Sequence, residues 1–364
     1  MRRKRAFLAL STVTTLCVGV VAPDTAGAGN AVVLLDGLSS PKGIDVTAFS
    51  DVVVAQGAFG PPGPVLVLPA GEDEPFEATD PVNLTDVAVS DFDGSGWAIG
   101  PDGEAPTPDE AHVLLFRQVP ETGEIEVVLD ITAYQQTDPD PFDQDDFAEE
   151  SNPYGLTIDH NGDALIADAA NNDLIRVTVG GHASTVARFD LEEVSTSHLG
   201  PHSGLPPTIT AEAVPTSVTV GRNGAIYVGE LKGFPFRPGS SRVWRIAPDA
   251  HNVRCSVNHP QSGCTTYVKR LTAIQDIDIN QNNNRLYVYE LAAAGVLAFE
   301  AGFETGDFPP AVLVQIRPNK DRRRLAVGEL SQPGGVAVGP RGAVYVTDHV
   351  FGDGRLLRVP LSSS

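Results

Sequence analysis

Basic residues are scarce in this chain. It has 25 Lys and Arg residues against 47 Asp and Glu residues, which gives a formal net charge of -22 at pH 7. An acidic surface of this kind repels nucleic acid and anionic lipid headgroups. The composition therefore excludes nucleic acid as a partner and predicts a soluble protein that meets neutral or cationic molecules.

Cysteine is also scarce, with three residues in the chain. Two of them, Cys255 and Cys264, lie close together on either side of an Asn-His-Pro segment. In an oxidising compartment this spacing predicts a local disulfide that closes a hairpin loop. A zinc site that includes His251 and His259 is the alternative, but the usual spacing of zinc ligands is missing.

Long apolar runs are missing after the first residues of the chain. Residues 2–5 are basic, residues 6–22 are mostly apolar, and Ala26-Gly27-Ala28 follows. This order is typical of a secretory signal peptide with small residues at its cleavage site. We expect cleavage after Ala28, secretion, and no membrane attachment afterwards; a retained anchor is the alternative. Residues 29–364 are then predicted to form a single domain.

Long helical patterns are few, and a repeated order of short segments takes their place. Each unit has a Pro-x-Gly or related start, an apolar strand, a short turn, a second apolar strand ending in an acid, and a third strand with Arg. Three close copies begin at Pro153, Pro215 and Pro333. Asn-Gly between the first two strands predicts hairpins with type I′ turns, because both central residues of that turn need positive φ.

Weaker copies begin at Pro41, near Asp86 and at Ile277, which makes six. Repeated four-stranded units predict an all-β, six-bladed β-propeller. The last unit lacks a fourth strand, whereas residues 31–35 form an unattached apolar strand before the first unit. We therefore expect closure of the ring by pairing of this N-terminal strand with the C-terminal blade. A β-sandwich or an open solenoid is the alternative fold.

Several segments of the repeat carry a family resemblance. They are Val214-Pro215-Thr216-Ser217-Val218, Val228-Gly229-Glu230-Leu231-Lys232-Gly233-Phe234-Pro235-Phe236, Asn152-Pro153-Tyr154-Gly155 and Pro333-Gly334-Gly335-Val336. Over nearly the whole mature chain, the sequence resembles the ScyD/ScyE family of exported propellers, which are NHL-like and SMP-30-like. The resemblance implies export and a propeller fold, but no particular reaction.

Acidic residues end the second strand in four units, at Asp168, Glu230, Glu290 and Asp348. The second strands of a propeller end near one face, so these carboxylates are candidates for binding a ligand or a divalent cation such as Ca²⁺. The alternative is structural: each acid pairs with an Arg of the third strand or with backbone N–H groups, because buried charges are normally paired. In that case Asp168 would pair with Arg176, Glu230 with Arg245 and Asp348 with Arg358.

The SMP-30 and gluconolactonase relatives use a divalent metal in the channel as a Lewis acid. Their pattern places a metal-binding Glu before the first inner strand, whereas residues 38–43 of this chain contain no acid. A metal-dependent hydrolase or lactonase is therefore the alternative function rather than the first hypothesis. No Gly-x-Ser-x-Gly motif is present to indicate a serine nucleophile.

Two aromatic residues, Phe234 and Phe236, lie between the second and third strands of one unit. Exposed rings beside a channel suit ligand stacking or partner contact, whereas packing on the neighbouring blade is the alternative. His349 follows the acidic strand end Asp348, and a histidine beside a carboxylate can act as a general base. We also include residues 296–310 in the candidate rim.

Acidic residues crowd residues 138–150, together with Phe142 and Phe147. The segment fails the EF-hand pattern, because Phe142 and Asp143 stand where that loop needs a ligand and a Gly. It is predicted to be a solvated acidic loop, with structural calcium as the alternative. We therefore expect a monomeric extracellular binding or accessory module without catalytic residues of its own, whose partner is a small molecule or an extracellular protein.

Overall fold

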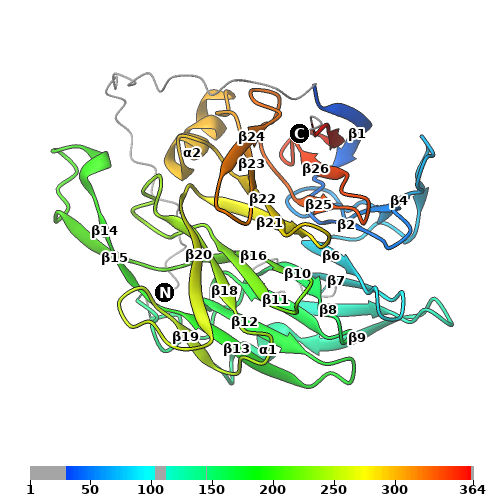
Figure 1. Ribbon diagram of the computed structural model, residues 1–364, viewed down its shortest axis with the longest axis horizontal. Helices are drawn as coiled ribbons and strands as arrows, with labels where there is room; N and C mark the ends of the chain where they lie inside the picture. Colours follow the sequence, from blue (N-terminus) through cyan, green and yellow to red (C-terminus); the bar gives the residue numbers. More distant parts are fainter. Residues whose placement is uncertain (1–29, 103–111, 145, 362–364) are drawn as a thin grey trace.

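The computed structural model describes residues 30–102, 112–144 and 146–361, so the signal peptide expected over residues 1–28 lies outside the described residues. Among the helices that are described, none is long and apolar enough to cross a membrane. The described chain is built almost entirely of antiparallel sheets arranged around a common centre (Figure 1). The predicted six-bladed β-propeller is confirmed.

The first three blades follow one another along the chain, each as an antiparallel meander. Blade 1 contains β2 (Ile44–Val46), β3 (Val52–Val54), β4 (Leu66–Leu68) and β5 (Phe76–Glu77). Blade 2 contains β6 (Asp86–Val89), β7 (Gly96–Pro101), β8 (Val113–Gln118) and β9 (Ile125–Asp130). Blade 3 contains β10 (Pro153–Ile158), β11 (Ala164–Asp168), β12 (Asp173–Val177) and β13 (Ala183–Phe189).

The other three blades complete the ring. Blade 4 contains β16 (Pro215–Val220), β17 (Ile226–Glu230), β18 (Ser241–Ile246) and β20 (Cys264–Leu271). Blade 5 contains β21 (Ile274–Asn280), β22 (Arg285–Glu290), β23 (Val312–Ile316) and β24 (Arg322–Leu325). Blade 6 contains β25 (Val336–Val338), β26 (Val344–Asp348), β27 (Asp353–Val359) and β1 (Val32–Ser39), so it includes both ends of the described chain.

The strand β1 is antiparallel to β27, with Val32 opposite Arg358 and Ser39 opposite Asp353. At the centre, the first strand of every blade contacts the first strands of both neighbours, from β2 round to β25 and back to β2. The Pro-x-Gly motif serves this close approach. A Cβ atom on Gly43 would lie 2.7 Å from the Cα atom of Asp86 in the next blade, and one on Gly155 would lie 2.7 Å from that of Ser217.

The predicted hairpins are present, but the predicted type I′ turns are wrong. In the Asn161-Gly162 turn only Gly162 has positive φ, at 85°. The Gly162 N–H donates to the Asp159 carbonyl at 3.0 Å, and the Asp159 N–H donates to the Asp163 carbonyl at 2.8 Å. The loop is therefore one residue longer than a type I′ hairpin, and a single left-handed Gly closes it.

The hydrophobic core is divided among the contacts between blades. Six clusters of buried side chains each join two consecutive blades. In one of them Leu174 of blade 3 packs with Val228 and Trp244 of blade 4. Burial of apolar area between faces, at about 25 cal/mol per Å², is the main force that holds such a ring together.

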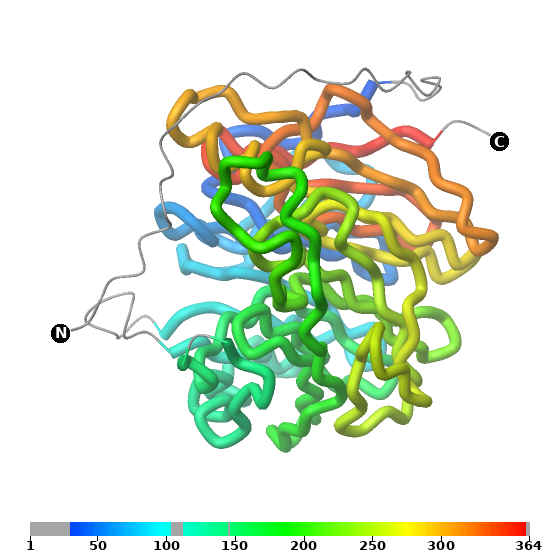
Figure 2. Tube along the Cα trace, turned by 90° about the vertical axis from the view of Figure 1, so that its left-hand side faces the viewer, coloured from blue at the N-terminus to red at the C-terminus, as the bar shows by residue number. Residues whose placement is uncertain are grey.

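Two insertions depart from the repeat. The connection from blade 3 to blade 4 forms a hairpin of β14 (Glu192–Ser195) and β15 (Thr208–Ala211), which stands out from the ring in Figures 1 and 2. The second insertion is β19 (Val253–Cys255), which lies within blade 4 in the sequence but pairs in parallel with β13 of blade 3. Two short helices, α1 (Ile131–Gln135) and α2 (Val296–Thr305), lie in other connections.

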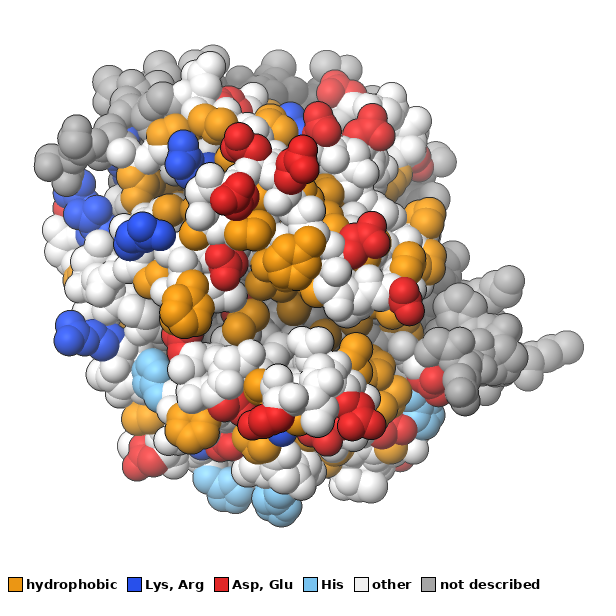
Figure 3. Space-filling view, turned by 90° about the vertical axis from the view of Figure 1, so that its right-hand side faces the viewer, with side chains coloured by type: hydrophobic (Ala, Val, Ile, Leu, Met, Phe, Trp, Pro, Cys, Tyr) orange, Lys and Arg blue, Asp and Glu red, His pale blue; other side chains and the backbone are white. Residues whose placement is uncertain are grey.

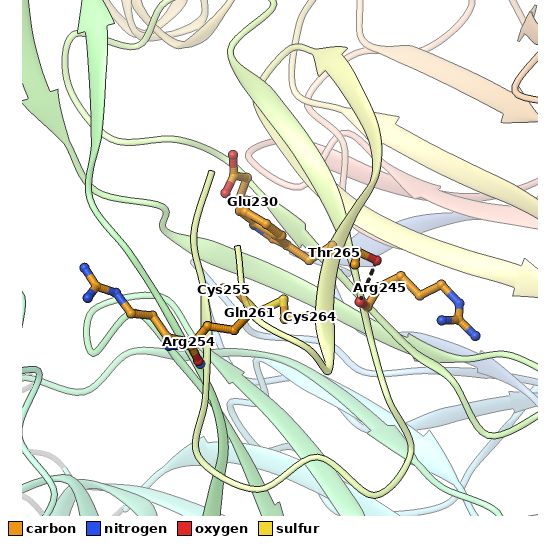
Figure 4. Close-up of a disulfide and its surroundings, with 8 residues drawn as sticks. Glu230, Arg245, Arg254, Cys255, Gln261, Cys264 and Thr265 are labelled. Atoms are coloured by element: carbon orange, nitrogen blue, oxygen red, sulfur yellow. Dashed lines mark hydrogen bonds between the residues drawn. A yellow bond between two sulfur atoms is a disulfide. The ribbon is translucent and has the colours of Figure 1, made fainter. Parts of the chain in front are cut away.

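The predicted disulfide is present between Cys255 and Cys264, whose Cα atoms lie 5.3 Å apart. Cys255 belongs to β19, which pairs with blade 3, whereas Cys264 opens β20 of blade 4 (Figure 4). The bond therefore joins two blades as well as closing a loop. An ion pair supports the same contact, because Arg254 Nη2 lies 2.6 Å from Asp190 Oδ2.

Candidate functional site

Strands of a blade alternate in direction, so all connections between second and third strands emerge on one face of the ring. We call this the rim face. Its described loops include residues 55–65 of blade 1, 231–240 of blade 4, 291–311 of blade 5 and 349–352 of blade 6. The four acids predicted from the sequence, Asp168, Glu230, Glu290 and Asp348, end the second strands just below these loops. All four are buried.

Glu230 is held by two cations and an indole. Its Oε1 atom lies 2.9 Å from Arg242 Nε and 3.1 Å from Lys232 Nζ, and its Oε2 atom accepts from Trp244 Nε1 at 2.9 Å. Glu192 of β14 completes the cluster by pairing with Arg242 and with Lys232. Burial would lower the pKa of Arg242, but the charges of Glu230 and Glu192 outweigh it and raise that pKa.

Asp348 is also engaged on both carboxylate oxygens. Its Oδ1 atom accepts from Tyr289 Oη at 3.1 Å and from the Ser331 N–H at 2.9 Å, while Arg355 pairs with Oδ2. Burial raises the pKa of Asp348, although the Arg355 hydrogen bond opposes the shift. His349 lies 3.9 Å from Oδ2 and only 3.4 Å from Arg355 Nη2, so the imidazole shares the carboxylate with a permanent cation.

Asp168 and Glu290 have no direct Arg partner among the described contacts. Asp168 accepts hydrogen bonds from Ser151 Oγ and from the Asn152 N–H, both at 2.7 Å, and burial raises its pKa. Glu290 accepts from the Thr272 N–H at 2.7 Å, and burial raises its pKa to about 7. Hydrogen-bond donors next to each acid therefore hold its carboxylate in place.

Arg residues of the third strand do pair with Glu230 and Asp348, but they are not the Arg residues that were predicted. Across a hairpin, the last residue of one strand faces the first residues of the next, as Asp348 faces Arg355. The predicted Arg358 instead faces Tyr345. In blade 3 the same rule places Asp173 opposite Asp168, while Arg176 faces Leu165 and lies 3.5 Å from Asp159.

The four candidate metal ligands are not gathered into one site. Within residues 30–102, 112–144 and 146–361, no group of three or more His, Cys, Asp or Glu side chains is placed to hold a metal ion. In the acidic segment, Asp138 pairs with Arg188, Asp140 accepts from Asn172 Nδ2 at 3.1 Å, and Asp143 accepts from the Phe147 N–H at 3.1 Å. These three carboxylates bind the protein itself.

A second set of acids lines the axis. Asp45, Asp86, Asp276 and Asp278 of the first strands each accept the N–H of the following residue and one N–H from the neighbouring blade. Burial raises the pKa of Asp45 to about 8 and that of Asp278 to about 6. These carboxylates bridge blades that share no sheet, and they surround a cavity of about 30 Å³.

Lys42, the middle residue of the first Pro-x-Gly motif, lies at the same axis. Its Nζ atom donates to the Tyr154 carbonyl at 2.6 Å and stands 4.0 Å from the centre of the Tyr154 ring. Tyr154 is the middle residue of the blade 3 motif, and its hydroxyl accepts from Gln275 of blade 5 at 2.7 Å.

Aromatic rings form a belt across the rim loops of four blades. Phe234 contacts Phe236, whose side chain packs on the cluster beneath α2 that includes Phe299. The ring of Phe303 on α2 then lies 5.0 Å from that of Phe351 in blade 6, and Phe351 lies 5.0 Å from Phe59 in blade 1. The aromatic belt comprises Phe234, Phe236, Phe299, Phe303, Phe308, Phe351 and Phe59.

The belt has an exposed side and a packed side. Phe303 is 56% exposed, Phe234 47%, Phe59 46% and Phe351 41%, whereas Phe299 is buried. Of the two rings predicted for ligand contact, Phe234 is free to bind, and Phe236 is half-buried against the neighbouring loop. Phe299, Phe303 and Phe308 lie in the segment 296–310 that the sequence analysis included in the rim. Phe59 and Phe351 were missed because they come from loops that are far apart in the sequence.

A scan against models of protein families finds no match, and a search of curated proteins finds none either. The fold is similar to that of a solved glucose dehydrogenase, with a TM-score of 0.57 and 15% identity over 92% of this chain and 100% of that one. It is also similar to the PQQ-bound aldose sugar dehydrogenase of Streptomyces coelicolor, with a TM-score of 0.54 and 12% identity over 93% and 99% of the two chains.

A third similar structure is the apo-form soluble aldose sugar dehydrogenase of Escherichia coli, with a TM-score of 0.53 and 13% identity over 91% of this chain and 99% of that one. At such low identity, the likeness shows the propeller fold alone. The resemblance to the ScyD/ScyE family stays a prediction.

Proposed function

We propose that this protein is an exported binding module of the ScyD/ScyE type that holds a partner against its rim face. The aromatic belt carries the proposal. Isolated exposed apolar residues are ordinary on protein surfaces, but a contiguous apolar patch marks a binding surface. Here Phe303, Phe351 and Phe59 come from three different blades and contact one another in a row.

The charge around the belt indicates the chemistry of the partner. Residues 291–311 include Glu300, Glu304 and Asp307 but no Lys or Arg. Figure 3 shows the side of the molecule away from α2, where acidic and hydrophobic side chains also lie together and most Lys and Arg side chains lie toward the left-hand edge. The partner that fits is an extracellular protein segment with both apolar and basic side chains.

The alternative, a metal-dependent hydrolase or lactonase, would need carboxylates that are free to bind a cation. Glu230 already contacts Arg242 and Lys232, and Asp348 contacts Arg355. A metal would have to displace these buried cations, which costs more than the binding of an exposed carboxylate. The geometry therefore favours binding over hydrolysis at these residues.

A central organic cofactor also fits poorly. One of the similar structures is described as PQQ-bound, so we considered whether the centre of this propeller has room for such a molecule. The axial cavity of about 30 Å³ has room for one or two waters, far less than the roughly 300 Å³ at the low end of ligand pockets. Lys42, Tyr154 and Gln275 occupy the axis in its place.

The proposal is tested with a labelled synthetic peptide that alternates Lys with Phe and Leu, titrated with the mature protein in a fluorescence anisotropy assay. We expect saturable binding, weakened at least about tenfold by F303A/F351A, because central aromatic anchors dominate interfaces. F49A is the matched control, since Phe49 is 83% exposed in the β2–β3 turn on the opposite face. Equal binding by all three proteins would contradict the proposal.

A further inference from the structure

A groove at the edge of blade 4 gathers positive charge in an otherwise acidic protein. It has a volume of about 230 Å³ and lies between the β14–β15 hairpin, the rim loop of blade 4 and the end of β20. Its charged lining residues are four cations, Arg237, Arg242, Lys269 and Arg270, and two acids of β14, Glu192 and Glu193. Lys269 and Arg270 belong to the outermost strand of the blade, so the groove is separate from the axial cavity.

The cations of the groove differ in what they already bind. Arg242 is committed to Glu230 and Glu192, and it forms a fixed, buried floor. Lys269 and Arg270 are exposed, and within the described part of the chain their side chains take part in no ion pair. These two side chains are therefore available to a ligand.

The walls of the groove are held in place by hydrogen bonds. Arg237 Nη1 donates to the Ser195 carbonyl at 3.2 Å and to Ser197 Oγ at 2.9 Å, which ties the rim loop to the hairpin. Arg270 has a φ of 62°, a left-handed conformation that is unusual for a residue with a side chain. Arg322 of blade 5 donates to the Arg270 carbonyl at 2.7 Å and fixes this turn.

We propose that the groove binds an oxyanion, namely a small ligand that carries a carboxylate, sulfate or phosphate group. Guanidinium groups match such groups in geometry and charge. The volume is below that of pockets for drug-sized ligands, so it suits a single group or one acidic sugar ring. The proposal does not rest on the aromatic belt or on a partner bound there.

The experiment is isothermal titration calorimetry of the mature protein with three separate probes: inorganic phosphate, sulfate and glucuronate. We expect saturable binding of at least one probe, at least tenfold weaker in K269Q/R270Q and weakened by added NaCl. A preference for glucuronate would indicate a sugar acid, and a preference for phosphate or sulfate would indicate an inorganic or ester group.

The matched control is R222Q, because Arg222 is exposed on the β16–β17 turn of the same blade, at the opposite face. R222Q removes one positive charge without touching the groove, and we expect it to bind the probes like the unmodified protein. No saturable binding of any probe would overturn the proposal. An equal loss in R222Q and K269Q/R270Q would also overturn it, since that would reflect net charge alone.

Discussion

The second-strand ends and the aromatic belt lie close together on the rim face but use their side chains in opposite ways. Below the loops, Glu230 and Asp348 are buried and fully engaged by neighbouring donors. Above them, Phe303 and Phe351 leave about half of each ring in water. The difference shows that charged residues at a propeller rim can be buried in the fold while apolar residues stay exposed, the reverse of the usual expectation for a surface. In the proposed function these exposed rings bind the partner.

The largest effect on stability is expected from E230A. The change leaves the buried Lys232 and Arg242 with the less buried Glu192 as their remaining carboxylate, and breaking a buried ion pair in this way costs about 3–5 kcal/mol. Urea unfolding followed by circular dichroism measures the loss. The control E193A removes an acid from the adjacent hairpin, where Glu193 is exposed and bonds only Thr210 among the contacts described. Similar stability of E230A and E193A would show that the buried contacts of Glu230 do not stabilise the fold.

Replacing both cysteines, in C255S/C264S, is expected to lower the free energy of unfolding by about 2–3 kcal/mol, the value for a disulfide that closes a loop of this length. The loss should be accompanied by faster amide exchange in β19, because the bond fixes that strand between blades 3 and 4. Hydrogen exchange with mass spectrometry checks both points. Unchanged exchange in β19 would mean that the disulfide stabilises only the loop between the two cysteines and not the contact between the blades.

Stability is expected to fall as the pH rises from 5 to 8. The pKa values of Glu290 and Asp45 are raised by burial to about 7 and about 8, so the folded protein keeps protons that the unfolded chain releases above about pH 4. Their contribution is complete below the unfolded pKa and is lost as the pH passes the folded values. Thermal melts should show a lower Tm at pH 8 than at pH 5.

The variant E290Q sharpens this pH prediction. A glutamine can still accept the Thr272 N–H through its amide oxygen, but it does not titrate. Its Tm should therefore change less between pH 6 and pH 8 than that of the unmodified protein. An identical pH profile in both proteins would assign the effect to the axial carboxylates instead.

The smallest effect on stability is expected from F303A, at less than about 1 kcal/mol, because its ring is largely exposed. Phe299 on the same helix is the matched comparison. Phe299 lies on the buried side of α2, and F299A should lower the free energy of unfolding by about 3 kcal/mol or more. Thermal unfolding of the two variants separates the packed side of the belt from its exposed side, and equal losses would mean that Phe303 serves packing.

The ring itself could be predicted from the sequence, because the repeat is a local signal. Strands, hairpin glycines such as Gly162 and the motif glycine Gly155 recur at fixed distances, and each has a local steric cause. The disulfide was predictable for the same reason. The partners of the buried acids were not, since the choice of Arg358 over Arg355 ignored the register in which the end of one strand faces the start of the next.

The candidate site was predicted only in part, because it depends on contacts between distant segments. Phe59 and Phe351 are separated by almost the whole chain but lie 5.0 Å apart. The basic groove depends on the β14–β15 hairpin. This hairpin lies in the long connection between blades 3 and 4, which does not follow the repeat pattern. No spacing in the sequence brings Ser195 beside Arg237.

The pairing of β1 with β27 has a consequence for how the protein is made. β1 is among the first described residues to be synthesised, and its partner strand is the last. Until β27 has been synthesised, β1 has an unpaired edge that can pair with other chains. The contact also joins residues far apart in the sequence, and pairings of this kind form slowly, so we expect β1 and β27 to pair late in folding. Protection of β1 from a protease should therefore appear late, after the other blades have formed.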